Sequence, residues 1–174
     1  LADALEQVRD LAIRDDLTGL FNRRHILEVL EHQKALADNQ IYPFSVCYVD
    51  LDHFKRINDE YGHDMGDRVL RQFAEHTLDN LREGDYLARL GGEEFILVLP
   101  QSDLAGAELV AERLRESWAA RSFEDRRGPP AVSLSAGVAS YRGKETVDQL
   151  LGRADRALYR AKTGGRNRVC REDQ

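Results

Sequence analysis

Residues 86–99 read Tyr-Leu-Ala-Arg-Leu-Gly-Gly-Glu-Glu-Phe-Ile-Leu-Val-Leu, two apolar runs joined by two glycines and two glutamates. Gly91 and Gly92 favour a tight turn, because both can adopt positive φ without a Cβ clash and both let a ligand come close. The pattern predicts a β-hairpin with Glu93 and Glu94 at its tip. An ordinary hairpin with a solvated acidic turn would read the same, so this stretch alone does not establish a ligand site.

A second acidic segment favours a metal. Residues 43–52 form a strand-like run that ends in Asp50 and Asp52, whose side chains point the same way at a period of two. Two strand ends can therefore present Asp50, Glu93 and Glu94 together. Carboxylates, completed by water and phosphate oxygens, suit Mg²⁺ better than zinc or copper. The expected substrate is then a nucleoside triphosphate.

Periodicity along the rest of the chain predicts an α+β fold. The order strand, helix, hairpin, helix, strand corresponds to a ferredoxin-like βαββαβ core, with extra helices at its ends. The expected helices span 22–38, 54–59, 64–82, 103–120 and 146–163, and the expected strands span 43–52, 86–99 as a hairpin, 131–140 and a short segment near Arg168. Two buried stripes are expected, one formed by Val69, Leu70, Phe73, Ala74, Thr77, Leu78 and Leu81 and the other by Leu104, Ala107, Ala111, Leu114 and Trp118. Residues 123–130 are expected to form a mobile loop.

Composition agrees with one soluble domain, which we expect to lie in the cytoplasm. The 174 residues are 42% hydrophobic and 32% charged, and a formal net charge of -6 argues against nonspecific nucleic-acid binding. Cys47 and Cys170 show no paired spacing, so neither a disulfide framework nor a zinc site is indicated. No apolar run approaches the roughly 20 residues that span a bilayer, so we expect no membrane contact by this segment, although a longer protein could be membrane-anchored.

The first residues predict a helix with an apolar stripe formed by Leu1, Leu5, Val8, Leu11 and Ala12. Such a stripe suits equally a helix that folds back on the domain and a coiled-coil stalk. Because the sequence starts without Met, we expect it to lie inside a longer protein. The expected division is a linker helix at 1–14, a catalytic domain at 15–170 and a short tail at 171–174.

Several motifs follow one another in a recognisable order. They are Asp15-x-Leu17-Thr18-Gly19-Leu20-x-Asn22-Arg23-Arg24, Asp50-x-Asp52-x-Phe54-Lys55-x-Ile57-Asn58-Asp59, Tyr61-Gly62-His63-x-x-Gly66-Asp67, Arg82-x-x-Asp85, Gly91-Gly92-Glu93-Glu94-Phe95 and Lys162-x-x-Gly165-Arg166-Asn167. From about Asp15 to Asn167 the chain resembles the GGDEF domains, or diguanylate cyclases, with Glu at the third signature position. The resemblance implies a fold like that of nucleotidyl cyclases and polymerase palms.

The resemblance also implies a reaction. Family members condense two GTP into 3′,5′-linked cyclic di-GMP and release two pyrophosphates, each ribose 3′-hydroxyl attacking the α-phosphate of the other nucleotide. By motif match, Asp50, Glu93 and Glu94 are the catalytic and metal-binding residues, the Leu51 carbonyl is a further ligand, and the metal is Mg²⁺, with Mn²⁺ as an option. For Asp52 two interpretations stay open, a residue of the site and a cap of the following helix. One domain binds one GTP, so the resemblance implies a two-fold homodimer.

Other positions match the family's substrate and inhibitor sites. Asn58 and Asp67 match guanine-binding positions, although Asp67 also suits the first turn of a helix. The remaining substrate residues by motif match are Phe54, Lys55, His63, Gly91, Gly92, Lys162 and Arg166. Lys162 and Arg166 would alternatively be a cationic helix end. Arg82 and Asp85, with Arg113, match a site where the product cyclic di-GMP inhibits; a local ion pair in a turn is the alternative.

Three other functions stay open. The same fold could make a different or mixed nucleotide, bind cyclic di-GMP as a receptor without catalysis, or serve only for dimerisation. The intact acidic and basic motif residues favour the cyclase. The family resemblance also implies an upstream sensory or receiver domain.

Overall fold

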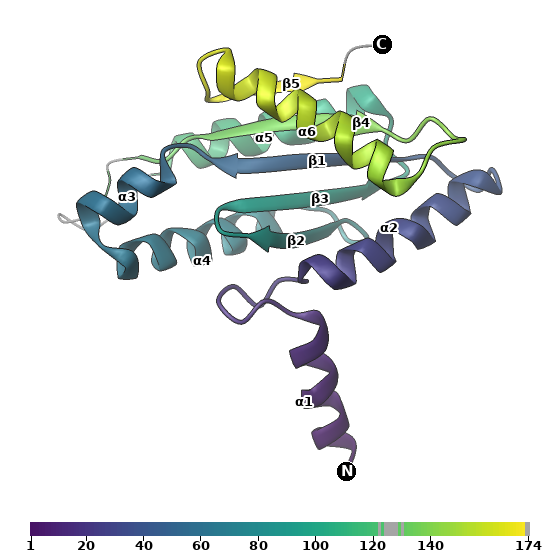
Figure 1. The fold of residues 1–174 in the computed structure, drawn as a ribbon, viewed down its shortest axis with the longest axis horizontal. Coiled ribbons are helices and arrows are strands. Elements are labelled where there is room, and N and C mark those ends of the chain that lie inside the picture. Colours follow the sequence, from purple (N-terminus) through teal and green to yellow (C-terminus); the bar gives the residue numbers. More distant parts are fainter. Residues whose placement is uncertain (122, 124–128, 130, 173–174) are drawn as a thin grey trace.

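The computed structural model describes residues 1–121, 123, 129 and 131–172. Within these residues, five strands form one sheet in the order β2-β3-β1-β4-β5 (Figure 1). They are β1 (Phe44–Leu51), β2 (Tyr86–Gly91), β3 (Glu94–Pro100), β4 (Leu134–Ser140) and β5 (Arg168–Arg171). Neighbouring strands are antiparallel, except that β4 and β5 run parallel. Without β5 the order is that of a ferredoxin-like βαββαβ sheet, which confirms the predicted fold class.

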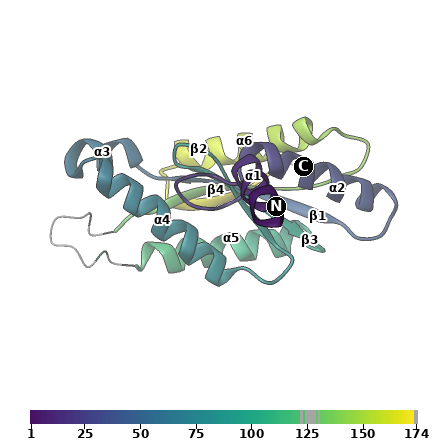
Figure 2. The ribbon, with the colours of Figure 1, turned by 90° about the horizontal axis from the view of Figure 1, so that it is seen from below.

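Helices cover both faces of this sheet. They are α2 (Arg23–Asp38), α3 (Phe54–Tyr61), α4 (His63–Asn80), α5 (Leu104–Ala119) and α6 (Val147–Thr163), preceded by α1 (Ala2–Ile13). Figure 2 shows α2 and α6 on one face and α4 and α5 on the other. The predicted spans match these elements to within a few residues. Most of the loop expected at 123–130 lies outside the described residues.

Alternation along β1 separates two cores. Cys47, Val49 and Leu51 are buried with the helices α4 and α5, whereas Phe44 and Val46 are buried with α2 and α6. Since successive side chains of a strand point to opposite faces, Asp50 lies on the α6 side of the sheet. The Asp50 carboxylate near the end of β1 therefore points toward α6.

The helix α6 approaches the sheet closely at one glycine of β4. A Cβ at Gly137 would lie 2.2 Å from the Leu158 backbone nitrogen and 2.3 Å from the Ala154 carbonyl oxygen. Only glycine permits this contact, which brings the C-terminal end of α6 against the end of β1.

Details of α4 differ from the prediction. Leu78, expected in the buried stripe, is 52% exposed, because 100° per residue places it about 140° around the helix from the buried Phe73. Leu81 is only partly buried, as the residue after the helix. The helix begins at His63, so Asp67 lies in its second turn and not in the first.

The N-terminal helix stands apart from the domain. No residue of α1 is buried, and Figure 1 shows it projecting away from the sheet. Leu1, which precedes the helix, and Leu5, Val8 and Leu11 within it are all exposed. The interpretation of a helix folded back on the domain is therefore wrong, and the coiled-coil stalk stays a prediction. No helix in the described part of the chain has the length and apolar character to cross a membrane.

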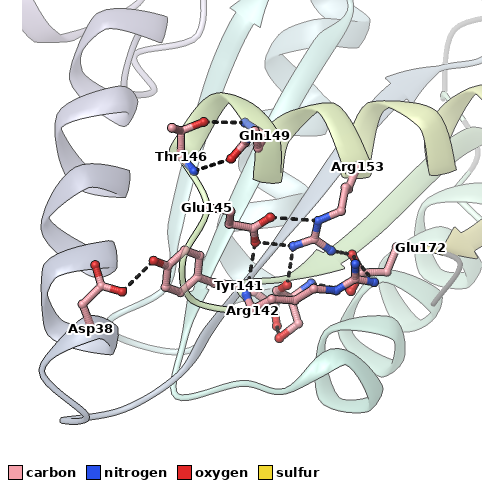
Figure 3. Close-up of polar contacts among 10 residues, drawn as sticks. Asp38, Tyr141, Arg142, Glu145, Thr146, Gln149, Arg153 and Glu172 are labelled. Carbon is pink, nitrogen blue, oxygen red and sulfur yellow. Dashed lines mark hydrogen bonds and ion pairs between the residues drawn. The ribbon is translucent and has the colours of Figure 1, made fainter.

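A cluster of buried charges closes the far end of the sheet. Arg153 of α6 pairs with Glu145 and Glu172 and donates to the Ser140 carbonyl oxygen at 2.8 Å (Figure 3). The Glu172 backbone nitrogen also donates to the Val138 carbonyl at 2.9 Å. We call Glu145, Arg153 and Glu172 the distal cluster. It fastens the chain beyond β5, so the ordered structure continues into the segment expected to be a tail.

Candidate active site

The hairpin and the end of β1 meet as one acidic surface. Glu94 is the Cα partner of Asp50 across β3 and β1, and the Leu51 backbone nitrogen donates to the Glu93 carbonyl at 3.3 Å. The turn itself needs Gly92, whose φ of 51° is strained for other residues. We call Asp50, Glu93 and Glu94 the acidic tip. The structure thus brings together the carboxylates that the sequence placed on two strand ends.

Asp50 is the buried member of the acidic tip. It is 6% exposed, and its Oδ2 accepts a hydrogen bond of 2.6 Å from Lys162 Nζ. Burial raises the pKa of Asp50 to about 6, Lys162 opposes this, and the charges of Glu93 and Glu94 add to it. Lys162 is thus paired with Asp50, yet the surroundings of this carboxylate still favour its neutral form.

These donors fit a cation that arrives with a phosphate. Within the described residues, no three His, Cys, Asp or Glu side chains lie close enough to form a metal cage by themselves. Mg²⁺ commonly uses only one or two carboxylates and takes its other oxygens from water and substrate phosphates. The carboxylates of Asp50 and Glu94, with the Leu51 carbonyl nearby, are such a partial oxygen set.

Asp52 does not cap the helix that follows it. The residue at the start of α3 is His53, with a φ of 57°, and α3 has no side-chain cap. The buried Asp52 carboxylate instead accepts hydrogen bonds from Ser133, Ser135 and the backbone of Asn167. The helix-cap interpretation is wrong, because three other donors occupy its oxygens.

The C-terminal cations lie where α6 ends. Lys162 is in the last turn, where a cation also favours the helix dipole. Arg166 follows in an exposed turn with a φ of 63°. The pairing of Lys162 with Asp50 connects this turn to the acidic tip across the sheet.

The helices α3 and α4 hold the residues matched to guanine binding. Asn58 packs against Gly66, where an added Cβ would overlap the Asn58 amide oxygen. This contact places Asn58 beside the residue that precedes the partly buried Asp67. Phe54 is buried below them, whereas Lys55 and His63 are exposed.

The residues matched to product inhibition lie apart from the acidic tip. Arg82 Nε donates to Asp85 Oδ1 at 3.0 Å, and the same guanidinium donates to the Pro100 carbonyl and to Ser102. The Asp85 side chain is 2% exposed. Arg113 is exposed on α5. In this structure the Arg82 pair thus closes the turn before β2.

Sequence reasoning missed how the first motif supports the hairpin. Arg89 Nε donates to the Gly92 carbonyl at 2.9 Å, and its NH1 donates to both Asp15 oxygens at 3.1 and 3.2 Å. Burial alone would raise the pKa of Asp15, but hydrogen bonds from Thr18 and Arg89 lower it below the usual value. The motif that begins at Asp15 thereby braces the glycine turn. The sequence offers only one signal for the pair of Asp15 and Arg89, which is their opposite charge, and the two residues lie 74 positions apart.

Sequence reasoning also missed a cleft on the α2 and α6 face. It has a volume of about 330 Å³ and reaches Glu94 of the acidic tip. Arg23, Tyr48 and Asp155 are among its lining residues. Burial raises the pKa of Tyr48 to about 12.

Comparison with known sequences identifies one family. The family model described as "Diguanylate cyclase, GGDEF domain" matches residues 12–168. Diguanylate cyclase DgcP of Pseudomonas aeruginosa is 42% identical over 165 residues, which are 95% of this chain and 25% of DgcP. Diguanylate cyclase DgcM of Escherichia coli is 45% identical over 166 residues, 94% of this chain and 39% of DgcM. The chain thus spans less than half the length of these curated relatives.

Comparison with solved structures finds the same family. The coiled coil and GGDEF domain of DgcB from Caulobacter crescentus, in complex with c-di-GMP, has a TM-score of 0.92 at 33% identity. The match covers 98% of this chain and 91% of that one.

Proposed function

Because the chain belongs to the GGDEF family, we propose that it is a diguanylate cyclase domain, which condenses two GTP into 3′,5′-linked cyclic di-GMP and releases two pyrophosphates. The observation that carries the proposal is the pairing of Asp50 with Glu94 across two strands, opposite Lys162. Carboxylates and a lysine in this arrangement suit a metal-bound triphosphate. A pure dimerisation module would not require them.

Asp50, Glu93, Glu94 and the Leu51 carbonyl would hold Mg²⁺, or Mn²⁺ in its place. When bound, the ion would neutralise charge on the reacting phosphate groups. The raised pKa of Asp50 supports this assignment, since a second cation would relieve the repulsion from the glutamates.

Lys162, Arg166 and Lys55 are proposed to bind the triphosphate. Arg166 and Lys55 are exposed, and Lys162 lies at the edge of the acidic tip. Arginine offers a planar fork to phosphate oxygens, whereas lysine offers a point charge. Gly91 and Gly92 leave room for the nucleotide because neither carries a side chain that would block it.

Asn58 and Asp67 are proposed to select guanine. A carboxylate accepts from the guanine N1 and N2 hydrogens, and an amide donates to O6 or N7. The packing of Asn58 against Gly66 supports a fixed orientation for this amide. Phe54 and His63 would complete this side of the substrate site.

Two domains would face each other about a two-fold axis, each supplying the 3′-hydroxyl that attacks the nucleotide of the other. The exposed apolar stripe of α1 supports a stalk that pairs two chains, with a sensory or receiver domain before it in the whole protein. Turnover per chain should therefore rise with protein concentration.

Arg82, Asp85 and Arg113 are proposed to bind cyclic di-GMP as an inhibitor. Arg82 is 55% exposed along its side chain and can reach a phosphate only by giving up part of its contacts within the turn. We expect Arg82→Ala to raise the inhibitory concentration of cyclic di-GMP about tenfold while turnover without product persists. An unchanged inhibition curve would remove this site from the proposal.

The test is incubation of the chain with GTP and Mg²⁺ over a range of protein concentrations, with products separated by chromatography. Cyclic di-GMP should form, and Glu94→Ala should slow it by about a hundredfold or more. Glu31→Ala, an exposed residue of α2, is the matched control. A parallel reaction with mixed GTP and ATP reports base selection.

Absence of product has two explanations that a fusion separates. A leucine zipper placed before Leu1 should restore turnover if only dimerisation is lacking. If the fused chain stays inactive but binds cyclic di-GMP tightly, the domain is a receptor and the cyclase proposal is wrong.

A further inference from the structure

Asp52 is a buried carboxylate whose use the proposed reaction does not explain. It is 4% exposed. Its Oδ2 accepts from Ser133 Oγ at 2.7 Å and from the Asn167 backbone nitrogen at 3.0 Å, and its Oδ1 accepts from Ser135 Oγ at 2.7 Å. Its own backbone nitrogen donates to the Ser133 carbonyl at 2.9 Å. The residue therefore joins the end of β1 to the starts of β4 and β5.

These contacts leave little capacity for a metal. A carboxylate offers about four lone-pair positions, and three of those on Asp52 are filled by hydrogen bonds. Asp50, two residues earlier, has Lys162 as its close partner and the charges of the acidic tip around it. Of the two aspartates, only Asp50 has the surroundings of a cation ligand.

The turn that Asp52 holds is strained. Gly165, Arg166 and Asn167 have φ values of 121°, 63° and 47°, a run of three positive angles in which the last two residues are not glycine. Such conformations cost energy and persist only where neighbouring contacts enforce them.

Further contacts fix the same turn. The Arg166 backbone nitrogen donates to the Ala161 carbonyl at 3.0 Å, and Arg115 of α5 donates to Asn167 Oδ1 at 3.0 Å. Arg168 Nε donates to the Arg166 carbonyl at 3.1 Å. Of these anchors, only the bond to Asp52 ties the turn to the strand that carries Asp50.

We infer that Asp52 is a positioning residue, which holds the turn carrying Arg166 at a fixed place relative to the acidic tip. The triphosphate of a nucleotide can then contact the metal ligands and the Arg166 side chain at the same time. The inference rests on the proposed function for the nature of its ligand. The two aspartates at the end of β1 then have different roles: Asp50 is a ligand of the metal ion, and Asp52 orients the phosphate-binding turn.

The test compares variants by binding, not by turnover. Titration calorimetry with a nonhydrolysable GTP analogue gives its dissociation constant at saturating Mg²⁺, and a Mg²⁺ titration gives the concentration for half-maximal analogue binding. Asp52→Asn should weaken analogue binding about tenfold, because the amide loses the negative charge that strengthens the three bonds and sets an NH₂ group against at least one of the donors that now face the carboxylate. The Mg²⁺ requirement should stay unchanged, whereas Asp50→Asn should raise it.

Ser133 supplies a matched pair that touches no proposed ligand. Ser133→Ala removes one donor to Asp52 and should weaken analogue binding in the same direction, by less. Ser133→Thr keeps the hydroxyl and should restore it. Amide hydrogen exchange at Asn167 should be faster in Asp52→Asn and Ser133→Ala, at equal global stability, than in the parent chain.

Each outcome decides between the roles. A raised Mg²⁺ requirement in Asp52→Asn, matching that of Asp50→Asn, would make Asp52 a metal ligand and overturn the inference. Unchanged analogue binding in Asp52→Asn would also overturn it. A parent chain that binds the analogue, but makes no cyclic di-GMP even when fused to the leucine zipper, would sink the proposed function alone, since the binding comparison still stands. A parent chain that binds no analogue would overturn both.

Discussion

The two ends of the central sheet each carry a cluster of charges, and the clusters differ in how far those charges cancel. At the distal cluster, Arg153 lies between Glu145 and Glu172, and Arg142 lies 3.7 Å from Glu172. Backbone groups of Ser140 take up further hydrogen bonds there. The two acids of the distal cluster thus lie against two cations, Arg142 and Arg153.

At the acidic tip the balance is broken. Asp50 pairs with Lys162, yet the pKa of Asp50 rises to about 6, because burial and the charges of Glu93 and Glu94 disfavour its charged form. A fold gains nothing in stability from such a surface. A charge cluster around a buried group thus marks a candidate site when its charges are incompletely neutralised, and a structural contact when they are balanced.

The largest expected effect lies on turnover at the acidic tip. Asp50→Asn keeps the shape of the side chain but removes its charge, and should lower cyclic di-GMP formation by about a thousandfold. Glu172→Gln, the same kind of change in the distal cluster, should leave turnover of the folded chain nearly unchanged. Initial rates at equal concentrations of folded protein measure both. Similar losses in the two variants would erase the distinction between the clusters.

The second effect is on stability, and here Glu172→Gln should be the more damaging of the two variants. Glu172→Gln leaves Arg153 buried with one carboxylate fewer and should lower the free energy of unfolding by about 3 kcal/mol. Asp50→Asn should lower it far less, since the carboxylate it removes is a costly one. Urea denaturation followed by circular dichroism, without metal or nucleotide, provides the comparison. The contrast fails if Asp50→Asn proves the more damaging change.

The smallest effect is the dependence of stability on pH. The pKa of Asp50 in the fold, about 6, lies above its unfolded value near 3.8. Its contribution to stability is therefore present below about pH 4 and is lost as pH rises through about 6. The unfolding temperature of Asp50→Asn, relative to that of the parent chain, should therefore rise by about 3 °C between pH 4.5 and pH 7.5. Thermal scans with a chelator present measure this gain; a midpoint difference that is constant with pH would contradict the raised pKa.

Much of the fold follows from local pattern. The apolar runs around Gly91 and Gly92 become β2 and β3, and the period-two ending of the first strand carries Asp50 to the hairpin. Both depend on residues close together in the sequence. Errors occurred where a helix face had to be assigned residue by residue, as at Leu78, or where α1 needed a partner surface that the domain does not provide.

Three of the contacts that sequence reasoning missed join residues far apart in the sequence. Asp15 meets Arg89, Arg153 meets Glu172, and Asp52 meets Asn167 only after the sheet is assembled. Periodicity and spacing carry no information about which distant charges pair. The motif match named Asp50 and Lys162 together, but the pattern of residues by itself would have kept Lys162 as a helix end.

Sequence separation at the acidic tip also bears on the order of folding. Lys162 is 112 residues from Asp50, and Asn167 is 115 residues from Asp52. Closing loops of this length is slow, and it requires the C-terminal segment to be made. During synthesis, every shorter chain presents the hairpin carboxylates without the lysine and without the held turn. Within this domain the candidate site is therefore completed last, so we expect ligand binding only in chains whose strand β5 has docked.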